Sequence, residues 1–352
     1  MKSKLPITRP FFPMEAKSVE EIPTGSNWQY EPKWDGFRCV AFREGRSVEL
    51  QSKSAQSLTR YFPELVAALG KLKPDKFVLD GELIVLVDEK LSFDDLLQRI
   101  HPAASRVATL SIQTPAKFVL FDLLVDSRGR SLIGQTLAQR RAKLEAFATE
   151  YLRGNSTFLL SPATADIKVA RQWLKTMRGQ LDGLIAKPLD APYSPGERAM
   201  QKIKNLRTVD CVVGGFRYGT KTKLAGSLLL GLYGNDGLLH HVGFTSSMER
   251  SSLPALTRKL EALVGTQGSA GIGFTGRAPG GPSRWSSERS AEWEALRPKL
   301  VVEVRYDHFT SGRFRHGTKF LRWRPDKAPL QCRMDQVEVA TKSPLTLLRK
   351  SA

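Results

Sequence analysis

The pattern of apolar residues changes near residue 207, and this change constrains the fold more than any other feature of the sequence. Before it, short runs rich in β-branched and aromatic residues alternate with segments whose apolar residues recur at helical spacing. The expected strands are 39–45, 47–52, 77–87 and 117–125, and the expected helices are 61–72, 137–152 and 168–177. Residues 1–207 are therefore predicted to form a mixed α/β domain.

Strands dominate after that point. The expected strands lie within 211–219, 227–245 and 300–309, and one helix is expected at 251–265. The Asn235-Asp236-Gly237 step inside an apolar run is typical of a β-hairpin turn. Short strands with such turns predict an all-β barrel of the OB type for residues 208–352, joined directly to the first domain through a hinge at 205–208. The predicted fold class is thus α+β.

The chain is strongly basic. Its 54 Lys and Arg against 35 Asp and Glu leave a net charge of +19, while 41% hydrophobic residues exclude disorder as the dominant state. Such a protein is expected to bind a polyanion, because neutralising phosphates releases condensed counterions. Cations and aromatic residues interleave over 276–328, which is typical of a surface that follows a nucleic-acid backbone; the alternative is that the rings face the barrel core. Residues 266–287, rich in Gly, Ser and Pro, predict a mobile surface loop.

Cysteine usage and hydropathy indicate where the protein works. Cys39, Cys211 and Cys332 lie far apart with no CxxC pair, which excludes a disulfide framework and a zinc ribbon. Apolar runs are too short to span a membrane, and the N-terminus lacks the apolar core of a signal peptide. We expect a soluble, cytoplasmic protein with no membrane partner.

The segment Glu31-Pro32-Lys33-Trp34-Asp35-Gly36-Phe37-Arg38 carries the most chemical information. By itself a lysine beside a turn, followed by a carboxylate and an arginine, would be read as a salt-bridged loop. Further short motifs follow it in order: Ser52-Lys53-Ser54, Asp80-Gly81-Glu82, Phe121-Asp122, Asp182-Gly183-Leu184-Ile185-Ala186-Lys187, Lys202-Ile203-Lys204 and Arg324-Pro325-Asp326-Lys327. The ordered set resembles the covalent nucleotidyltransferase superfamily, and within it most closely the small bacterial ATP-dependent DNA ligases known as LigC.

This resemblance implies an ATP-grasp-like nucleotidyltransferase domain at residues 1–207 and an OB-fold at 208–352, with ATP as cofactor and nicked duplex DNA as substrate. Lys33 matches the nucleophile that takes AMP, which then moves to a DNA 5′-phosphate and is displaced by a 3′-hydroxyl. A lysine near pKa 10.4 is mostly protonated, so burial and nearby cations are expected to lower the pKa of Lys33. Lys202 and Lys204 alternate on a strand, so both are expected to face the α-phosphate from one side.

The resemblance assigns the remaining roles residue by residue. Glu82 matches the acid that binds the ribose hydroxyls, Phe121 the ring that stacks on adenine, and Glu31 the group that reads the adenine amino group. The expected catalytic residues are Lys33, Asp35, Lys202 and Lys204; the expected nucleotide-binding residues are Glu31, Arg38, Glu82, Phe121, Lys187, Arg324, Asp326 and Lys327. The expected DNA-binding residues are Arg38, Ser52, Lys53, Arg217, Arg313 and Arg315. Arg324, Asp326 and Lys327 would orient the departing pyrophosphate.

The metal expectation rests on carboxylates. Asp182 stands where the family commonly has glutamate, and with Glu82 it is expected to hold Mg²⁺ or Mn²⁺, directly or through water. The sequence has no Walker-type loop and no HxH or HExxH pattern, which leaves an oxygen-liganded ion.

Two other functions share parts of this pattern. An RNA ligase or mRNA-capping-type enzyme shares the first half of the chemistry, and a binding module without catalysis shares only the basic surface. The resemblance further implies a role in DNA repair in the nucleoid of a bacterial cell, a monomeric state, and a Ku-type end-binding protein or a repair polymerase as partners. It leaves the lesion, the gap size and the preference for a 3′ ribonucleotide open.

Overall fold

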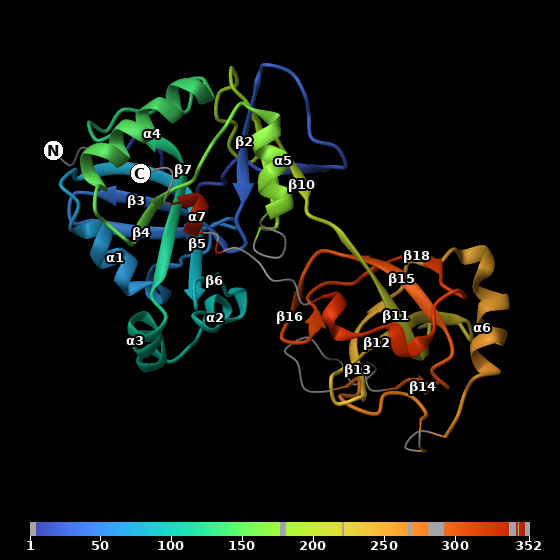
Figure 1. Ribbon diagram of the computed structural model, residues 1–352. Helices are drawn as coiled ribbons and strands as arrows, with labels where there is room; N and C mark the ends of the chain where they lie inside the picture. The colour runs from blue at the N-terminus through green and yellow to red at the C-terminus, as the bar shows by residue number, and fades with distance from the viewer. Residues whose placement is uncertain are drawn as a thin grey trace. The chain divides into compact units, whose positions relative to one another are not determined.

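The computed structural model divides the chain into two compact units, residues 1–205 with 341–352, and residues 206–340 (Figure 1). The structure describes residues 5–176, 181–219, 222–266, 269, 271–280, 292–337, 343 and 345–348. None of the helices within these ranges is long and apolar enough to cross a membrane. Each unit is described by itself below.

The first unit contains two sheets. A six-stranded sheet has the order β4 (Ser47–Ser52), β3 (Phe37–Glu44), β5 (Lys76–Val87), β7 (Ala116–Val125) and β8 (Phe158–Leu160), with β6 (Lys90–Leu91) paired to β5. A four-stranded sheet has the order β1 (Ala16–Val19), β10 (Met200–Lys204), β9 (Gly183–Pro188) and β2 (Trp28–Lys33). The β7–β8 and β1–β10 pairs are parallel and the others antiparallel.

Helices cover these sheets. They are α1 (Pro63–Gly70), α2 (Phe93–Gln98), α3 (Ala104–Gln113), α4 (Leu137–Tyr151), α5 (Ile167–Thr176) and α7 (Leu345–Leu348), with a 3₁₀ turn at Thr59–Tyr61. A capping box starts α4, because Thr136 accepts from the backbone of Gln139 while the Gln139 side chain accepts from the backbone of Thr136. Figure 1 shows α4 along β7 and α5 beside β2. The strands and helices predicted for this part of the chain are confirmed.

Strand β5 explains how a polar pocket forms beside a buried core. Its odd-numbered residues, such as Leu79 and Leu83, belong to the main core under α1 and α4. Its even-numbered residues face the other side, where Val78 and Ile84 are buried in two further apolar clusters. Asp80 and Glu82 lie between those two on the same face. The period of two therefore places carboxylates toward the pocket described below.

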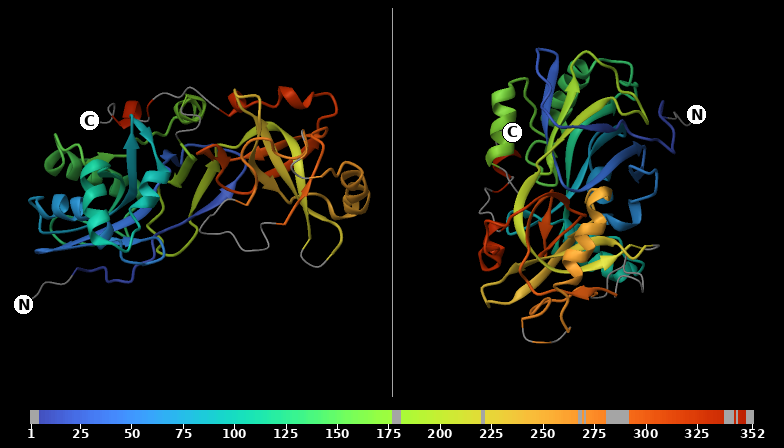
Figure 2. Two further views of the ribbon diagram at one scale, coloured as in Figure 1. Left: turned by 90° about the horizontal axis from the view of Figure 1, so that it is seen from below. Right: turned by 90° about the vertical axis from the view of Figure 1, so that its right-hand side faces the viewer.

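The C-terminal helix belongs to the first unit. Leu347 and Leu348 are buried in one cluster with Trp34 and Leu184, and the red α7 lies among the strands of that unit in both Figure 1 and Figure 2. Residues 341–352 were expected in the second domain because they follow it in sequence. The structure differs, since the two leucines bury their apolar surface against the first unit instead.

The second unit is a β-barrel. Its main sheet has the order β13 (Leu239–Thr245), β12 (Ala225–Tyr233), β11 (Arg207–Tyr218), β15 (Val301–Tyr306) and β18 (Lys319–Trp323), with β14 (Glu294–Ala295) paired to β11. A bridge between Thr245 and Thr318 joins the two outer strands. The barrel predicted from glycine turns is confirmed, including the hairpin turn, in which Gly237 has φ of +74°.

The remaining elements of the second unit surround this barrel. They are α6 (Leu253–Glu261), the hairpin β16 (Phe309–Thr310) and β17 (Arg313–Phe314), and 3₁₀ turns at Arg250–Ser252, Pro329–Gln331 and Met334–Gln336. Both views of Figure 2 show α6, in orange, along the outside of the barrel. Phe314 is buried in the barrel core, and Phe309, Phe320 and Trp323 pack against it. The alternative for the interleaved aromatic residues, that their rings face the core, is therefore observed for Phe314, while the other three are half-buried against the core and Trp285 lies outside the described residues.

The glycine-rich segment is partly bound to the barrel. Within its described residues, Gly273 and Gly276 donate to the carbonyls of Leu296 and Leu239 at 2.9 and 3.0 Å. The ring of Phe274 lies 2.7 Å from where a Cβ would stand on Gly214, so the barrel strand makes room for it with a glycine. Residues 267, 268, 270 and 281–287 of the predicted loop lie outside the described part.

Candidate active site

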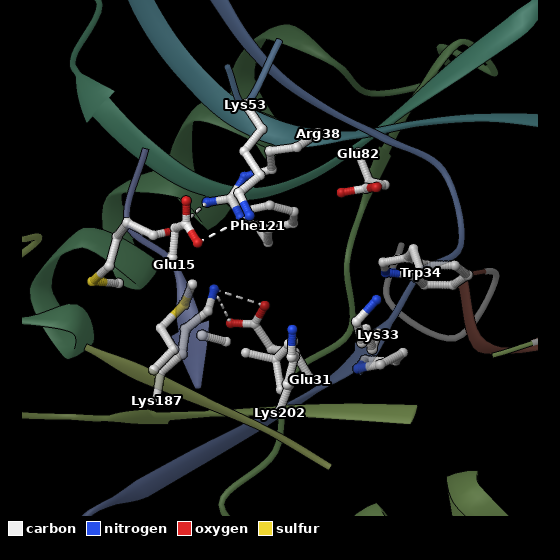
Figure 3. Close-up of a pocket in the computed structure, with 15 residues that line it drawn as sticks. Glu15, Glu31, Lys33, Trp34, Arg38, Lys53, Glu82, Phe121, Lys187 and Lys202 are labelled. Atoms are coloured by element: carbon white, nitrogen blue, oxygen red, sulfur yellow. Dashed lines mark hydrogen bonds and ion pairs between the residues drawn. The ribbon is translucent and has the colours of Figure 1, made fainter. Parts of the chain in front are cut away.

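A pocket opens in the first unit and takes residues from both sheets (Figure 3). We call it the lysine pocket. Its lining includes Glu31, Pro32 and Lys33 from β2, Arg38 from β3, Glu82 from β5, Phe121 from β7, Ile185 and Lys187 from β9, and Met200 and Lys202 from β10, together with Met14, Glu15, Ala16, Trp34 and Lys53. Eight of the residues predicted to act on the nucleotide or DNA therefore meet here, although the first and last of them, Glu31 and Lys202, are 171 positions apart in sequence.

Strand register explains why the lysines share one face. Lys33 is directly opposite Gly183, which is opposite Lys204 on the next strand. One step along, Glu31 is opposite Ile185, which is opposite Lys202. Residues directly opposite in antiparallel strands point to the same side of the sheet, as do residues two apart. The prediction that Lys202 and Lys204 share a face is confirmed.

Two glycines allow the backbone to close around this face. Gly183 has φ of +148°, and a Cβ there would lie 1.9 Å from the carbonyl oxygen of Ile203. A Cβ on Gly36 would lie 2.1 Å from the carbonyl oxygen of Leu83. Any larger residue would push β9 away from β10, or the turn after Lys33 away from β5.

The Lys33 ammonium forms an ion pair and hydrogen bond with the Asp182 carboxylate. The backbones of these residues are also bonded, because the Asp182 N–H donates to the Lys33 carbonyl at 2.9 Å. Burial lowers the pKa of Lys33, but Asp182 first, then Glu82 and Asp35, outweigh it and raise that pKa. The expected lowering is therefore not what this structure contains. Its physical reason is the carboxylate placed directly on the amine.

The charged forms of two further pocket residues, Lys202 and Glu82, are disfavoured. Burial, followed by Lys33, Lys204 and Lys53, lowers the pKa of Lys202. Burial raises the pKa of Glu82 to about 8, in spite of the nearby charges of Lys33 and Arg38. Both shifts favour the uncharged form, as expected where like charges gather in a partly dry site.

Arg38 is held in place by a buried network. Its Nε and Nη2 donate to the two oxygens of Asp80, each at 2.6 Å, and Asp80 is fully buried. The Tyr193 hydroxyl donates to Asp80 at 2.6 Å and accepts from the Met14 N–H at 3.0 Å. A bidentate arginine pair of this kind fixes orientation as well as charge. The guanidinium therefore stays at the pocket wall before any ligand binds.

A β-bulge turns Phe121 toward the same place. Along β5 and β7, Asp80 pairs with Asp122 but the next residue, Gly81, pairs with Leu120, so Phe121 is the extra residue. The bulge puts Phe121 and Asp122 on one side of the sheet. The Phe121 ring has the Arg38 guanidinium and the Lys187 ammonium each 4.6 Å from its centroid (Figure 3).

Glu31 is already bound within the protein. Its carboxylate lies 2.8 Å from the Lys187 ammonium and accepts from the Gln29 side chain at 2.7 Å, and all three residues are buried. An adenine amino group would therefore have to share oxygens that these two donors use. Beside the pocket entrance, Lys53 pairs with Glu15 at 2.9 Å, and the Ser52 hydroxyl accepts from the Gln56 N–H.

Carboxylates suited to a divalent cation lie beside Lys33. A carboxylate oxygen of Asp35 lies within 4.8 Å of one of Asp182. Hard cations such as Mg²⁺ prefer such oxygen donors, so the donor set fits the metal that was predicted. Glu82 is a third carboxyl group near these two, because repulsion from Asp35 contributes to its raised pKa.

The Arg324 motif forms a separate cluster in the second unit. Arg324 donates to Asp326 through Nε at 3.0 Å and through Nη2 at 2.8 Å, and to Asp210 through Nη1 at 2.8 Å. Lys327 donates to Asp210 at 2.7 Å. We call these four residues the barrel charge cluster. Hydrogen bonds from Arg324 lower the pKa of Asp326 to about 2.

The three arginines predicted to bind DNA in the second unit lie on different elements. Arg217 is on β11, Arg313 is on β17 and Arg315 follows it. Arg217 and Arg313, together with Arg277, act on His241, whose pKa falls to about 4, chiefly through burial. Arg217 and Arg313 therefore gather around one imidazole.

Several residues that support these sites were not singled out from the sequence. Asp80 and Asp122 lie inside motifs that drew attention for their neighbours, while Tyr193, Glu15 and Asp210 carried no assignment. A lone aspartate within the apolar run Val209-Asp210-Cys211-Val212-Val213 was the one available signal among these three. A buried carboxylate requires a partner, and that requirement pointed to a charged contact.

Comparisons with known proteins agree with this geometry. Residues 13–204 match the family model of the ATP dependent DNA ligase domain, and residues 221–327 that of the ATP dependent DNA ligase C terminal region. DNA ligase C2 of Mycolicibacterium smegmatis is 44% identical over 345 residues, covering 95% of this chain and 96% of that protein. The multifunctional non-homologous end joining protein LigD of Mycobacterium bovis is 30% identical over 312 residues, covering 86% of this chain and 37% of that protein. A solved structure from a study of Lig E DNA ligases shares the fold at 17% identity, with a TM-score of 0.51 over 88% of this chain and 99% of that one.

A two-sheet lysine pocket followed by an OB barrel, each half matched by its own family model, defines an ATP-dependent ligase. The chain belongs to the ATP-dependent DNA ligases, and within them to the bacterial LigC type.

Proposed function

We propose that this ligase seals nicks in duplex DNA through a covalent Lys33–AMP intermediate, with Mg²⁺ as its metal. The observation that carries the proposal is the lysine pocket: Lys33 ends a strand in a pocket that also contains an aromatic ring, a fixed arginine and a carboxyl group. Those are the groups needed to hold a nucleoside and attack its phosphate.

In the first step the Lys33 amine attacks the α-phosphorus of ATP. A nitrogen–phosphorus bond forms, the bond to the pyrophosphate oxygen breaks, and the amine loses a proton. The ion pair with Asp182 must open beforehand, because it keeps the amine protonated. Lys202 and Lys204 on the same sheet face would stabilise charge on the α-phosphate.

Asp182, Asp35 and Glu82 would hold the magnesium ion. Bound there, the ion supplies positive charge next to the phosphates. The carboxylate oxygens around Lys33 support this assignment.

Nucleoside binding follows from the other wall of the pocket. Phe121 would stack on adenine, which contributes about 1–3 kcal/mol for comparable base contacts. Arg38, fixed by Asp80, would contact the ribose and later the nick phosphate. Glu82 would bind the ribose hydroxyls, and its pKa near 8 allows it to donate as well as accept. Glu31 with Lys187 would read the adenine edge.

The later steps need DNA. Ser52, Lys53, Arg217, Arg313 and Arg315 would contact the DNA backbone, and the net charge of +19 favours such contacts. Arg324, Asp326 and Lys327 would orient the pyrophosphate of the first step. The end-joining name of the LigD relative supports a role in DNA repair. We further propose a Ku-type end-binding protein or a repair polymerase as partner and a monomer as the working form.

Labelling with α-³²P-ATP and magnesium tests the intermediate. We expect a labelled protein whose bond is stable in alkali and broken by acid, and we expect Lys33→Ala to abolish it. Lys117→Ala is the matched control, because the Lys117 ammonium bonds the Ser156 carbonyl at 2.6 Å and does not line the pocket. Full labelling of Lys33→Ala would contradict the proposal. Nicked duplexes with DNA or RNA 3′ ends, offered with ATP or GTP, separate a DNA ligase from an RNA ligase or capping-type enzyme.

A further inference from the structure

Asp210 is a buried carboxylate at the centre of the barrel charge cluster. Asp210 is 8% exposed and lies on β11 among apolar neighbours. It accepts from Arg324 Nη1 at 2.8 and 3.0 Å and from the Lys327 ammonium at 2.7 Å. One strand residue thus binds both cations of the motif.

Asp210 is itself held firmly, whereas its two partners lie in a turn. The Asp210 N–H donates to Gln336 Oε1 at 3.3 Å, and Gln336 Nε2 donates to the Asp210 carbonyl at 3.2 Å. On its other side β11 pairs with β15, with Asp210 opposite Glu303. Arg324 and Lys327 come directly after β18 ends at Trp323. The fixed strand therefore determines where the cations of the turn lie.

The cations keep donors to spare. A lysine ammonium has three N–H groups, and within the described residues Lys327 uses one of them, on Asp210. Arg324 has five, and within the same residues its hydrogen bonds go to two carboxylates, with Nε on both oxygens of Asp326, Nη2 on one of them and Nη1 on both oxygens of Asp210. Both side chains are about one-fifth exposed, at 20% and 22%. The unused N–H groups are available to an anion.

We propose that Asp210 is a positioning residue for enzyme adenylation, holding Arg324 and Lys327 in the geometry in which their free N–H groups bind the pyrophosphate end of ATP. This inference rests on the proposed function, in which these two cations orient pyrophosphate. It adds a requirement that the motif alone does not contain.

Charge and geometry make opposite demands on Asp210, and this separates the proposal from a simple electrostatic effect. A carboxylate in a cluster that binds an anion removes one positive charge, so Coulomb attraction for ATP would increase without it. If Asp210 positions the cations, its loss should instead slow adenylation, because a displacement of a binding group by about 1 Å can cost on the order of 10²-fold in rate. The direction of the change in an uncharged variant therefore discriminates between them.

The test is Asp210→Asn in the full-length enzyme. Asparagine keeps the shape but turns one acceptor into a donor facing two cations. We expect the single-turnover rate of Lys33 adenylation to fall about tenfold or more. We expect the reverse reaction, of enzyme–AMP with pyrophosphate, to fall by the same factor, since both pass through one transition state. Sealing of a nick that already carries AMP should stay within about twofold of wild type, because it needs no pyrophosphate contact.

Glu303→Gln is the matched control. Glu303 lies opposite Asp210 on β15 and binds Arg322 at 2.6 Å, so the variant also removes a carboxylate–arginine pair from the barrel. The Glu303 charge also acts on Arg324, though among the described residues no hydrogen bond joins the two, so adenylation should change far less than in Asp210→Asn. If Asp210→Asn unfolds the barrel, Asp210→Glu keeps the charge but shifts both cations by a methylene, and it should slow the same two reactions.

Three results would overturn the inference. One is an Asp210→Asn enzyme that adenylates at the wild-type rate or faster. Another is equal loss in adenylation and in sealing of the pre-adenylated nick, which would show a structural role. The third is an undiminished effect of Asp210→Asn in a background that already carries Lys327→Met and Arg324→Gln. Wild-type protein that takes no label would overturn the proposed function as well, so the two failures are distinguishable.

Discussion

The lysine pocket and the barrel charge cluster both place carboxylates on cations, but they treat charge in opposite ways. In the pocket, the pKa of Glu82 rises to about 8 and that of Lys202 falls, so both groups are driven toward their neutral forms. In the barrel cluster, the pKa of Asp326 falls to about 2 and that of Arg324 rises, so both are driven toward their charged forms.

The difference in these pKa shifts follows from how far positive and negative charges balance within each site. In the pocket, Lys33, Lys204 and Lys53 all lower the pKa of Lys202, and this positive charge would be neutralised by the phosphates of a nucleotide. Asp210 and Asp326 already neutralise their cations in the barrel. The pocket therefore keeps positive charge that a nucleotide would neutralise, whereas the charges of the barrel cluster balance one another and hold its remaining N–H groups in a fixed arrangement.

Replacing Asp182 should have the largest effect on this contrast. In Asp182→Asn the pocket loses the partner of Lys33 and the carboxylate that we propose as a metal ligand, and we expect adenylation to slow by roughly 10²-fold or more. Single-turnover labelling with ATP and magnesium measures it. Asp190→Asn is the control, since Asp190 binds Asn27 at the surface of the same unit. An Asp182→Asn enzyme with wild-type adenylation would show that the pocket does not depend on that carboxylate.

The pH dependence of adenylation sharpens the same comparison. In the proposed mechanism only the neutral amine of Lys33 attacks, and Asp182 raises the pKa of that amine, so the wild-type rate should increase as pH rises into the alkaline range. Without the negative charge, in Asp182→Asn, the rising part of the profile should move to lower pH by about one unit or more. Rates from pH 6 to 10 at saturating ATP provide the measurement. A profile that keeps its position would mean that Asp182 does not control the proton on Lys33.

The parts of the pocket that obey strand periodicity could be predicted from the sequence. Lys202 and Lys204 are two residues apart on a strand, so their common face follows from the pleat alone. Glu31 and Lys33 follow the same rule on β2. A helix such as α4 is indicated by its capping residues and by the spacing of its apolar residues. These inferences need only neighbours in sequence.

Contacts that depend on distant pairing could not be predicted in this way. Asp80 and Tyr193 are 113 residues apart, and nothing local indicates that one binds the other. Phe121 faces the pocket because of a bulge, which breaks the period of two that a sequence reading assumes. The docking of α7 on the first unit rests on Leu347 and Leu348 in a helix of four residues, too short for a periodic signal. The roles of Arg217, Arg313 and Arg315 in DNA binding stay predictions.

The smallest expected effect is on the pH dependence of folding stability. It tests whether charged groups are disfavoured only in the pocket or in the barrel as well. The pKa of Glu82 is raised to about 8, so the folded first unit holds a proton that the unfolded chain releases above about pH 4.5. Its stability should therefore decrease as pH rises from 4.5 to 8. The pKa of His241 in the barrel is lowered to about 4, so there the unfolded chain binds the extra proton, and stability should decrease as pH falls from 6.5 to 4.

Glu82→Gln and His241→Gln separate the two contributions, because each variant removes one of the two shifted groups. Hydrogen–deuterium exchange of β5 and of β13, followed across pH in native protein after correction for the intrinsic exchange rate, reports the two units independently. Glu82→Gln should flatten the profile of β5 alone, and His241→Gln that of β13 alone. If β13 keeps its loss of protection at low pH in His241→Gln, the barrel carries no disfavoured charge at that histidine, and the pocket would be the only one of these two sites under such strain.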